Sequence, residues 1–379
     1  MKLPTRRESF YEHRILQYRD SVSDPGMLVV RRALLPILAA TASSAYQLPS
    51  LATTTSARAV RATLPRMGDD DFAAVKPKTV FMFPGQGAQV IGMGAEAAKT
   101  VPAAAALYAK AAEILGYDLL AIDDKAKLDT TVVSQPAIFV ASLAAVEMLR
   151  ASEGGAKIIE DANMAMGLSL GEYTALAFAG AISFEDGVRI TKARGEAMQA
   201  ASEKSKSGMA SVIGLDSDKV DELCKAATAA TGEPVRIANY LCTGNYACSG
   251  SMVAVDKLCE IAKPEFKARM AIKLAVAGAF HTDFMAPAVP ALEAVLKNVK
   301  VVKPRIPVVS NVDAKAHSDP DVIKSILTKQ VTAPVQWETI MKNLCEQGFE
   351  AGYELGPGKV LSGIMGRVDK TKVITNIQV

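Results

Sequence analysis

From about Lys76 to the end of the chain, short apolar runs with strand character alternate with segments whose apolar residues recur at helical spacing. KTVFMF at 78–83 is one buried-strand candidate, and helical periodicity is present at 103–115 and 135–150. Such alternation is typical of an α/β fold, in which helices cover the faces of a sheet. The pattern therefore predicts a large α/β domain.

The rhythm changes between about 205 and 277, where the apolar runs and helical patterns follow the order strand, helix, strand, strand, helix, strand. This order, βαββαβ, is that of the ferredoxin-like split unit. The sequence therefore predicts a smaller ferredoxin-like subdomain at 205–277. We expect it to be inserted into a large α/β domain formed by residues 76–204 and 278–379.

Residues 1–75 have the layout of a targeting leader. Residues 1–68 carry ten Lys or Arg against four Asp or Glu, whereas the rest of the chain has 33 against 36. Two arginines, the apolar run ALLPILAA and small residues before Tyr46 predict a signal peptide at about 27–45. The following segment, 46–70, is rich in Ser, Thr, Ala and Arg, the composition of an organellar transit peptide.

A signal peptide followed by a transit peptide resembles the two-part leader of proteins sent to algal plastids of secondary origin. The leader therefore predicts a location in the plastid stroma, with Met27 as a candidate start. The alternative is a disordered tail with a chance apolar patch. The apolar run is too short for a comfortable membrane span, and the slightly acidic body gives no sign of nucleic-acid binding. We expect neither a membrane nor a nucleic acid as partner of the mature chain.

The cysteines and histidines offer little material for a metal centre. The five cysteines form no CxxC pair, and the chain has only three histidines. We expect reduced cysteines, no metal and no cofactor. The cysteines are Cys224, Cys242, Cys248, Cys259 and Cys345.

The segment GLSLG at 167–171 matches GxSxG, a pattern that can expose a nucleophilic serine on a tight turn. The strand-like MAMG precedes Ser169, and the helical LGEYTALAFAG follows it. In that context the helix N-terminus faces the oxyanion that would develop at the serine. The alternative is that the glycines serve only close packing.

A nucleophilic serine needs a base, and His281 in GAFHTDFM is the remaining candidate. His13 lies in the leader, and His317 lies in HSDPD, which is typical of a surface turn. A lone histidine is nevertheless more often structural. No acid is an evident third member, because Asp283 is only two residues from His281.

Several further residues have both a functional and a structural interpretation. The turn FPGQGAQ at 83–89 follows the first strand, so Gln86 and the amide of Leu170 could bind an oxyanion. The alternative is a glycine-rich structural turn. Arg194, Gln135 and Gln336 are also candidates, although most helical arginines are solvated.

Together these segments resemble the malonyl-CoA:acyl-carrier-protein transacylases of type II fatty acid synthesis. The resemblance covers residues 78–379 in order. Its segments are FPGQGAQ, SQPA, GLSLGEYTAL, KARGEAMQ, NYLCTGNYACSG, GAFHT, SNVDA, PVQWE and ELGPGKVLSG. It implies an α/β-hydrolase-like large domain with the inserted ferredoxin-like subdomain.

The resemblance implies a Ser-His dyad in which Ser169 carries the malonyl group and His281 is its base. It implies that the main-chain carbonyl of Gln336 orients His281, which would account for the missing acid. Gln86 and the amide of Leu170 would form the oxyanion hole.

The substrate site implied by the resemblance contains Arg194, Gln135 and Phe280. Arg194 would pair with the malonyl carboxylate. Phe280 in GAFH is similar to the malonyl pattern rather than to the YASH of methylmalonyl-selective relatives. The implied reaction is ping-pong transfer from malonyl-CoA to the phosphopantetheine thiol of acyl carrier protein, carried out by a monomer.

One residue departs from the common family pattern, since Leu168 stands where many members have a histidine before the serine. GLSLG is similar to the plastid branch of the family, in agreement with the leader. Three alternatives stay open at this point. They are a serine hydrolase, a non-catalytic module that binds carrier protein or acyl-CoA, and an acyltransferase domain of a polyketide synthase.

Overall fold

The computed structural model describes residue 72 and residues 74–379. The signal peptide expected at about 27–45 and the transit peptide expected at 46–70 lie outside these described residues.

The larger sheet has five parallel strands in the order β7-β2-β1-β8-β9. The strands are β1 Thr79–Phe83, β2 Ala162–Gly167, β7 Val308–Val309, β8 Ala351–Leu355 and β9 Ile374–Ile377. Because the strands are parallel, their carboxyl ends open onto the same edge of the sheet. The loops after β1, β2 and β7 therefore converge there, and β1 is in fact the strand predicted at 78–83.

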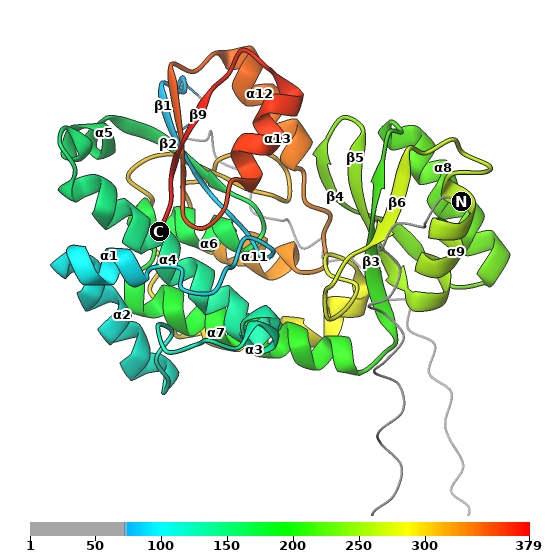
Figure 1. The fold of residues 1–379 in the computed structure, drawn as a ribbon, viewed down its shortest axis with the longest axis horizontal. Helices are drawn as coiled ribbons and strands as arrows, with labels where there is room; N and C mark the ends of the chain where they lie inside the picture. The colour runs from blue at the N-terminus through cyan, green and yellow to red at the C-terminus, as the bar shows by residue number, and fades with distance from the viewer. Residues whose placement is uncertain (1–71, 73) are drawn as a thin grey trace, which may run out of the picture. The chain divides into compact units, whose positions relative to one another are not determined.

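Helices cover both faces of this sheet, and alternate residues of β1 point to opposite sides. Phe81 and Phe83 pack into the core formed with α4 and α6, whereas Val80 and Met82 pack with Trp337 and its neighbours on α12 and α13. Figure 1 shows α12 and α13 on one side of the strands and α4, α6 and α7 on the other. The predicted α/β architecture is confirmed.

The helices of this part begin and end at the following residues. They are α1 Ala95–Thr100, α2 Pro102–Leu115, α3 Lys125–Asp129, α4 Thr131–Ala151, α5 Gly155–Asp161, α6 Leu170–Phe178, α7 Phe184–Glu203, the 3-10 helix η1 Asp283–Ala288, α10 Val289–Lys297, α11 Pro320–Gln330, α12 Trp337–Gln347 and α13 Val360–Val368. Ser183 caps α7, and its hydroxyl accepts from the Asp186 amide at 3.0 Å.

Among the described helices, α4 is the one long and apolar enough to cross a membrane by length and composition. Most of its residues are buried inside the protein, including Ile138, Phe139 and Val140. A helix that is apolar on all sides is expected at the centre of a large core. Its composition is therefore explained by packing.

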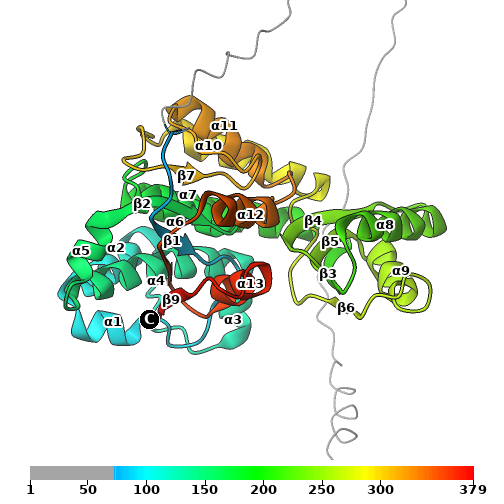
Figure 2. The same ribbon diagram turned by 90° about the horizontal axis from the view of Figure 1, so that it is seen from above.

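The second sheet is antiparallel, with strand order β4-β5-β3-β6. Its elements are β3 Ser207–Ile213, α8 Ser217–Thr231, β4 Val235–Cys242, β5 Asn245–Ser251, α9 Met252–Ala262 and β6 Met270–Lys273. This is the predicted βαββαβ order. Helices α8 and α9 lie beside the sheet (Figure 2), and their apolar residues are buried in one cluster with residues of its strands. The ferredoxin-like prediction is confirmed.

Backbone hydrogen bonds join this small sheet to the segment that leads into α12. The amide of Val335 donates to Ala238 O at 2.8 Å, and the amide of Tyr240 donates to Val335 O at 2.9 Å. A side-chain contact adds to them, since the Thr243 hydroxyl donates to Glu338 at 2.6 Å. Strand β4 is thus held next to the loop between α11 and α12.

All five cysteines are free. Cys224, Cys242 and Cys248 are buried, and Cys259 and Cys345 are partly exposed. The sulfur atoms of Cys224 and Cys248 lie 3.6 Å apart in the core of the small sheet.

Candidate functional site

The turn between β2 and α6 holds Ser169 in a strained conformation. Its backbone has φ +51° and ψ −101°, a region that residues other than glycine rarely adopt. A Cβ at Gly167 would lie 2.0 Å from backbone atoms of Gly171, so the chain can turn this sharply only with glycine there. The predicted strand-turn-helix context of Ser169 is present.

His281 lies against the serine, because its Nε2 is 2.8 Å from Ser169 Oγ. The ring is buried, and its Nδ1 lies 2.9 Å from the main-chain oxygen of Gln330. A carbonyl can only accept, so Nδ1 carries the proton and Nε2 presents its lone pair to the serine hydroxyl. This tautomer is the one that a general base requires.

The expectation that the Gln336 carbonyl orients His281 is wrong. Gln336 precedes α12, and its amide donates to Asn311 O at 2.8 Å. Gln330 is instead the last residue of α11, and the final carbonyls of a helix have no intrahelical donor. One of these free carbonyls is therefore available to the imidazole.

The surroundings of His281 keep its imidazole neutral. Burial, together with the nearby Arg194 and Arg236 cations, lowers its pKa to about 4, although hydrogen bonds to the backbone of Gln330 and Ala333 act in the opposite direction. The ring is therefore unprotonated at neutral pH. It can accept the serine proton without first losing one of its own.

The loop after β1 packs directly on the serine turn. The amide of Leu168 donates to Phe83 O at 3.0 Å. A Cβ at Gly85 would lie 2.4 Å from Leu168 O, so only glycine permits this approach. Gln86 therefore follows a residue in backbone contact with the turn. The amide of Leu170, the first of α6, belongs to the helix-terminal amides that lack an intrahelical acceptor.

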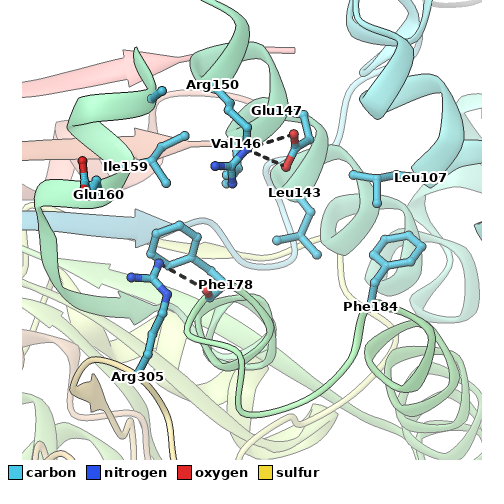
Figure 3. Close-up of a pocket in the computed structure, with 11 residues that line it drawn as sticks. Leu107, Leu143, Val146, Glu147, Arg150, Ile159, Glu160, Phe178, Phe184 and Arg305 are labelled. Carbon is cyan, nitrogen blue, oxygen red and sulfur yellow. Dashed lines mark hydrogen bonds and ion pairs between the residues drawn. The ribbon is translucent and has the colours of Figure 1, made fainter. Parts of the chain in front are cut away.

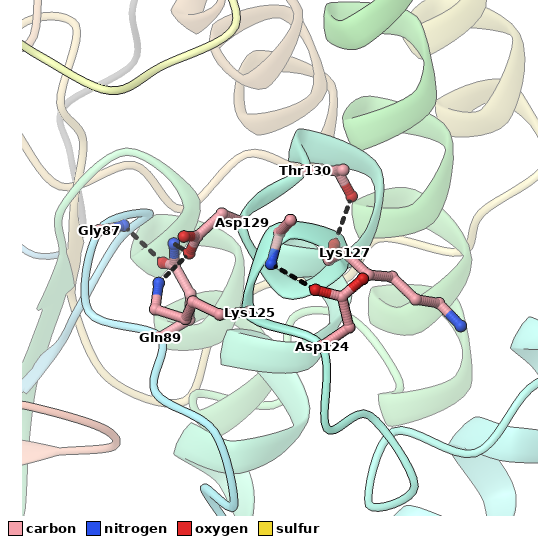
Figure 4. Close-up of polar contacts among 8 residues, drawn as sticks. Gly87, Gln89, Asp124, Lys125, Lys127, Asp129 and Thr130 are labelled. Carbon is pink, nitrogen blue, oxygen red and sulfur yellow. Dashed lines mark hydrogen bonds and ion pairs between the residues drawn. The ribbon is translucent and has the colours of Figure 1, made fainter. Parts of the chain in front are cut away.

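Side-chain contacts hold the far end of this loop (Figure 4). The Gly87 amide donates to Gln89 Oε1 at 2.7 Å, and Gln89 Nε2 donates to Asp129 Oδ1 at 2.9 Å. Lys125 also contacts Asp129, and its hydrogen bond, with that of Gln89, lowers the pKa of the carboxyl. The loop bearing Gln86 is thus fixed to α3.

Arg194 extends from α7 into the same site and is only 1% exposed. Its Nη2 donates to Ser169 Oγ at 3.1 Å and to Gln330 Oε1 at 3.0 Å, and its Nη1 donates to Gln135 Oε1 at 2.8 Å. The guanidinium carbon lies 5.2 Å from the centre of the Tyr173 ring. The predicted residues Ser169, His281, Arg194 and Gln135 are thus brought into one cluster.

The charge of Arg194 is uncompensated in the described part of the chain, where no carboxylate forms an ion pair with it. Its observed hydrogen-bond acceptors are neutral, and its Nε has no partner among the described residues. A buried, unpaired cation is costly unless an anion completes the site. The position beside Ser169 therefore fits a ligand that carries an anionic group near the atom attacked by the serine.

The structure adds three buried residues for which the sequence suggested no role: Glu172, Gln330 and Asn311. Glu172 Oε2 accepts from Gln330 Nε2 at 2.7 Å and from the Asn311 amide at 3.0 Å. Asn311 Oδ1 accepts from the Ser169 amide at 2.5 Å. Asn311 follows β7, the strand beside β2, so its place at the carboxyl edge of the sheet was the available signal.

Phe280 and His317 complete the sequence candidates. Phe280 is buried in the main core, in the same cluster as Ile190 and Met198 of α7. His317 was expected in a surface turn, but it is only 8% exposed, and its Nε2 lies 3.0 Å from Asp313 Oδ2. The bond with this carboxylate explains how the histidine is accommodated.

A separate cavity of about 390 Å³ lies among α2, α4, α5 and the ends of α6 and α7 (Figure 3). None of the site residues above lines it. Its two arginines already have partners, since Arg150 pairs with Glu147 at 3.1 Å and Arg305 lies over the Phe178 ring at 4.6 Å. Both arginines of the cavity are therefore accounted for by contacts within the protein.

The chain is similar to known proteins over most of its length. Residues 80–372 match the family model described as "Acyl transferase domain". The chain is 41% identical over 300 residues to the human "Malonyl-CoA-acyl carrier protein transacylase, mitochondrial", with 76% of each chain covered.

Solved structures are also similar to this chain. An acyl carrier protein S-malonyltransferase from Vibrio cholerae is 34% identical with a TM-score of 0.73, covering 79% of this chain and 97% of that one. A malonyl-transacylase solved with its type II acyl-carrier protein is 33% identical with a TM-score of 0.72, covering 79% and 94%.

The depressed pKa of His281 predicts how Ser169 reacts with phenylmethylsulfonyl fluoride, a reagent for activated serines. The rate constant should stay near its plateau as the pH falls from 8 to about 5.5, because the imidazole remains neutral until the pH approaches about 4. Mass spectrometry of timed samples measures the modification. A decline centred on the ordinary value of 6.5 would contradict the account.

The lowered pKa of His281 also makes the stability of the protein depend on pH. The folded chain disfavours the protonated imidazole, so the contribution of His281 to the free energy of unfolding is fully present above about pH 6.5. It is lost as the pH falls toward about 4.

Proposed function

This chain belongs to the acyl transferase domain family, and from that premise we propose that it transfers the malonyl group of malonyl-CoA to acyl carrier protein. The acceptor is the phosphopantetheine thiol, and the product supplies fatty acid synthesis. The observation that carries the proposal is the Arg194 guanidinium, buried without a carboxylate partner in the described chain and 3.1 Å from Ser169 Oγ. A malonyl group places a carboxylate two bonds from its thioester carbonyl carbon, which suits this spacing.

The first half of the reaction acylates the serine. His281 Nε2 accepts the hydroxyl proton while Ser169 Oγ attacks the thioester carbonyl carbon. Gln86 and the amide of Leu170 stabilise the oxyanion. The carbon-sulfur bond then breaks, and His281 returns the proton to the departing sulfur of coenzyme A.

The second half repeats these steps with a different thiol. The phosphopantetheine thiol of acyl carrier protein gives its proton to His281 and attacks the carbonyl carbon of malonyl-Ser169. The bond from this carbon to Ser169 Oγ breaks, and His281 returns the proton to the serine. Coenzyme A has left by then, so the kinetics are ping-pong.

Arg194 selects the acyl group in this proposal. A malonyl carboxylate can accept two parallel hydrogen bonds from the guanidinium, whereas an acetyl group leaves the cation unpaired. An unpaired buried group costs about 1 to 3 kcal/mol, and more when it is charged. Gln135 supports the guanidinium from α4, and Phe280 limits the space available to a branched acyl group.

Intact-protein mass spectrometry after addition of malonyl-CoA tests the transfer itself. We expect one added malonyl group, mapped by peptide analysis to Ser169, which holo acyl carrier protein removes quickly and water removes slowly. Rapid loss to water would indicate a serine hydrolase instead. Absence of any adduct on the folded protein would favour a binding module.

Replacing Arg194 tests the choice of acyl group. Arg194→Ala should lower kcat/KM for malonyl-CoA by about a hundredfold, because a charged hydrogen-bonding partner is lost from a buried site, while acetyl-CoA is used as well as before or better. Steady-state transfer to holo carrier protein measures both values.

The matched control is Arg189→Ala on the same helix, since Arg189 is half exposed and pairs with Asp186. It should leave the preference unchanged. If Arg194→Ala also keeps the wild-type preference for malonyl-CoA, Arg194 does not select the substrate.

We further propose that residues 1–75 direct the chain to the plastid stroma. The composition of residues 27–45 and 46–70 supports this proposal. The word "mitochondrial" in the name of the human relative describes the location of that protein. A fluorescent protein fused to residues 1–75 should enter the plastid when expressed in an alga with a secondary plastid. Accumulation in mitochondria would overturn the proposal.

The mature chain is proposed to act as a monomer, because Ser169, His281 and Arg194 contact one another within one chain. Light scattering during size-exclusion chromatography gives the molar mass. Twice the mass of one chain would contradict this proposal.

A further inference from the structure

We propose that Glu172 is a positioning residue, whose carboxyl fixes the side-chain amide of Gln330 and thereby keeps the Arg194 guanidinium against Ser169. The inference rests on the proposed malonyl transfer and adds to it a residue outside the dyad and the substrate contacts. Glu172 lies in the first turn of α6, three residues after Ser169, and is 3% exposed.

Glu172 is an unusual residue to bury at this place. In the described part of the chain no Lys or Arg forms an ion pair with it, and burial raises its pKa to about 7. Hydrogen bonds from the Asn311 amide and the Gln330 side chain oppose that rise. A carboxyl buried in such surroundings costs stability. Glu172 offsets that cost by holding two neighbouring groups in place.

The first group it holds is the carboxamide of Gln330. Gln330 Nε2 donates to Glu172 Oε2 at 2.7 Å and to Ser169 O at 3.0 Å, while Gln330 Oε1 accepts from Arg194 Nη2 at 3.0 Å. Two acceptors thus face the NH₂ group and one donor faces the oxygen. A flipped amide would set donor against donor and acceptor against acceptor, so all three partners favour one orientation.

The second group is the main chain at Asn311. Glu172 accepts from its amide at 3.0 Å, and the Asn311 side chain in turn accepts from the Ser169 amide and donates to Gly167 O at 2.8 Å. Through these two partners, the carboxyl of Glu172 is linked to both backbone polar groups of Ser169. Asn311 binds the Ser169 amide, and Gln330 binds the Ser169 carbonyl.

Gln330 connects Glu172 to His281 and Arg194. Its main-chain oxygen faces His281 Nδ1, and its side-chain oxygen faces Arg194. If Glu172 is lost, the carboxamide is free to turn away, and Arg194 keeps Gln135 as its one remaining amide acceptor. The guanidinium then no longer has a fixed place beside Ser169 Oγ. Selection of the malonyl carboxylate should suffer more than acyl transfer as such.

The test compares Glu172→Leu with Glu172→Gln, using malonyl-CoA and acetyl-CoA as substrates. Glu172→Leu should lower the malonyl-over-acetyl ratio of kcat/KM about tenfold, mainly through a higher KM for malonyl-CoA. Glu172→Gln retains an acceptor oxygen and should keep the ratio within about threefold of wild type. Rescue by the amide separates hydrogen bonding from loss of charge.

Glu354→Leu is the matched control. Glu354 is equally buried, and its carboxylate accepts from the amides of Leu361 and Ser362 at 2.9 Å each, at the start of α13. This variant should lower the Tm and leave the acyl ratio unchanged. A Glu172→Leu protein that shows only a lower Tm and a wild-type ratio would overturn the inference.

Gln330→Met provides a second measurement if Glu172→Leu does not fold. It removes the carboxamide but keeps the main-chain carbonyl for His281, and it should shift the ratio by the same factor. A wild-type ratio in Gln330→Met also overturns the inference. Malonylation of wild-type Ser169, measured in parallel, distinguishes this failure from failure of the proposed function, in which the wild type itself forms no adduct.

Discussion

The strained backbone of Ser169 is the constraint on which the rest of the site depends. A positive φ at a residue with a side chain costs on the order of 1–3 kcal/mol, and it persists only where the surroundings enforce it. Here the enforcement is close packing and hydrogen bonding. Gly85 and Gly167 let neighbouring backbone approach, Asn311 binds the serine amide, and Gln330 binds its carbonyl. The hydroxyl is thereby presented to His281.

The electrostatics of the site follow from placing one cation where water is largely excluded. Burial lowers the pKa of His281 and the Arg194 cation adds to that effect, so the base stays neutral. Arg194 itself remains bound to neutral oxygens because the described chain gives it no carboxylate. Glu172 is close by in the network but bonds to Gln330 instead. In the proposed reaction, the guanidinium is therefore available for the carboxylate of the substrate. In the proposed reaction, the same charge that helps to keep the base neutral also selects the acyl group.

Much of this could be predicted from the sequence. The alternation of strands and helices, the inserted βαββαβ unit and the turn at Ser169 are local patterns, and His281 was the one plausible base. The carbonyl that orients His281 was placed on Gln336 rather than Gln330, because a main-chain oxygen can come from any residue and leaves no signature. Glu172 was missed for a related reason. A glutamate in the first turn of a helix is usually solvated, and only the packing of α11 and the β7 loop buries it.

The central claim is that Arg194 binds the carboxylate of the malonyl group carried by Ser169. A crystal structure of the malonylated protein tests it most directly. The account predicts both terminal nitrogens of Arg194 within about 3 Å of the malonyl carboxylate oxygens, with His281 still near the ester. A malonyl carboxylate directed to solvent, with none of its oxygens near the terminal nitrogens of Arg194, would contradict it.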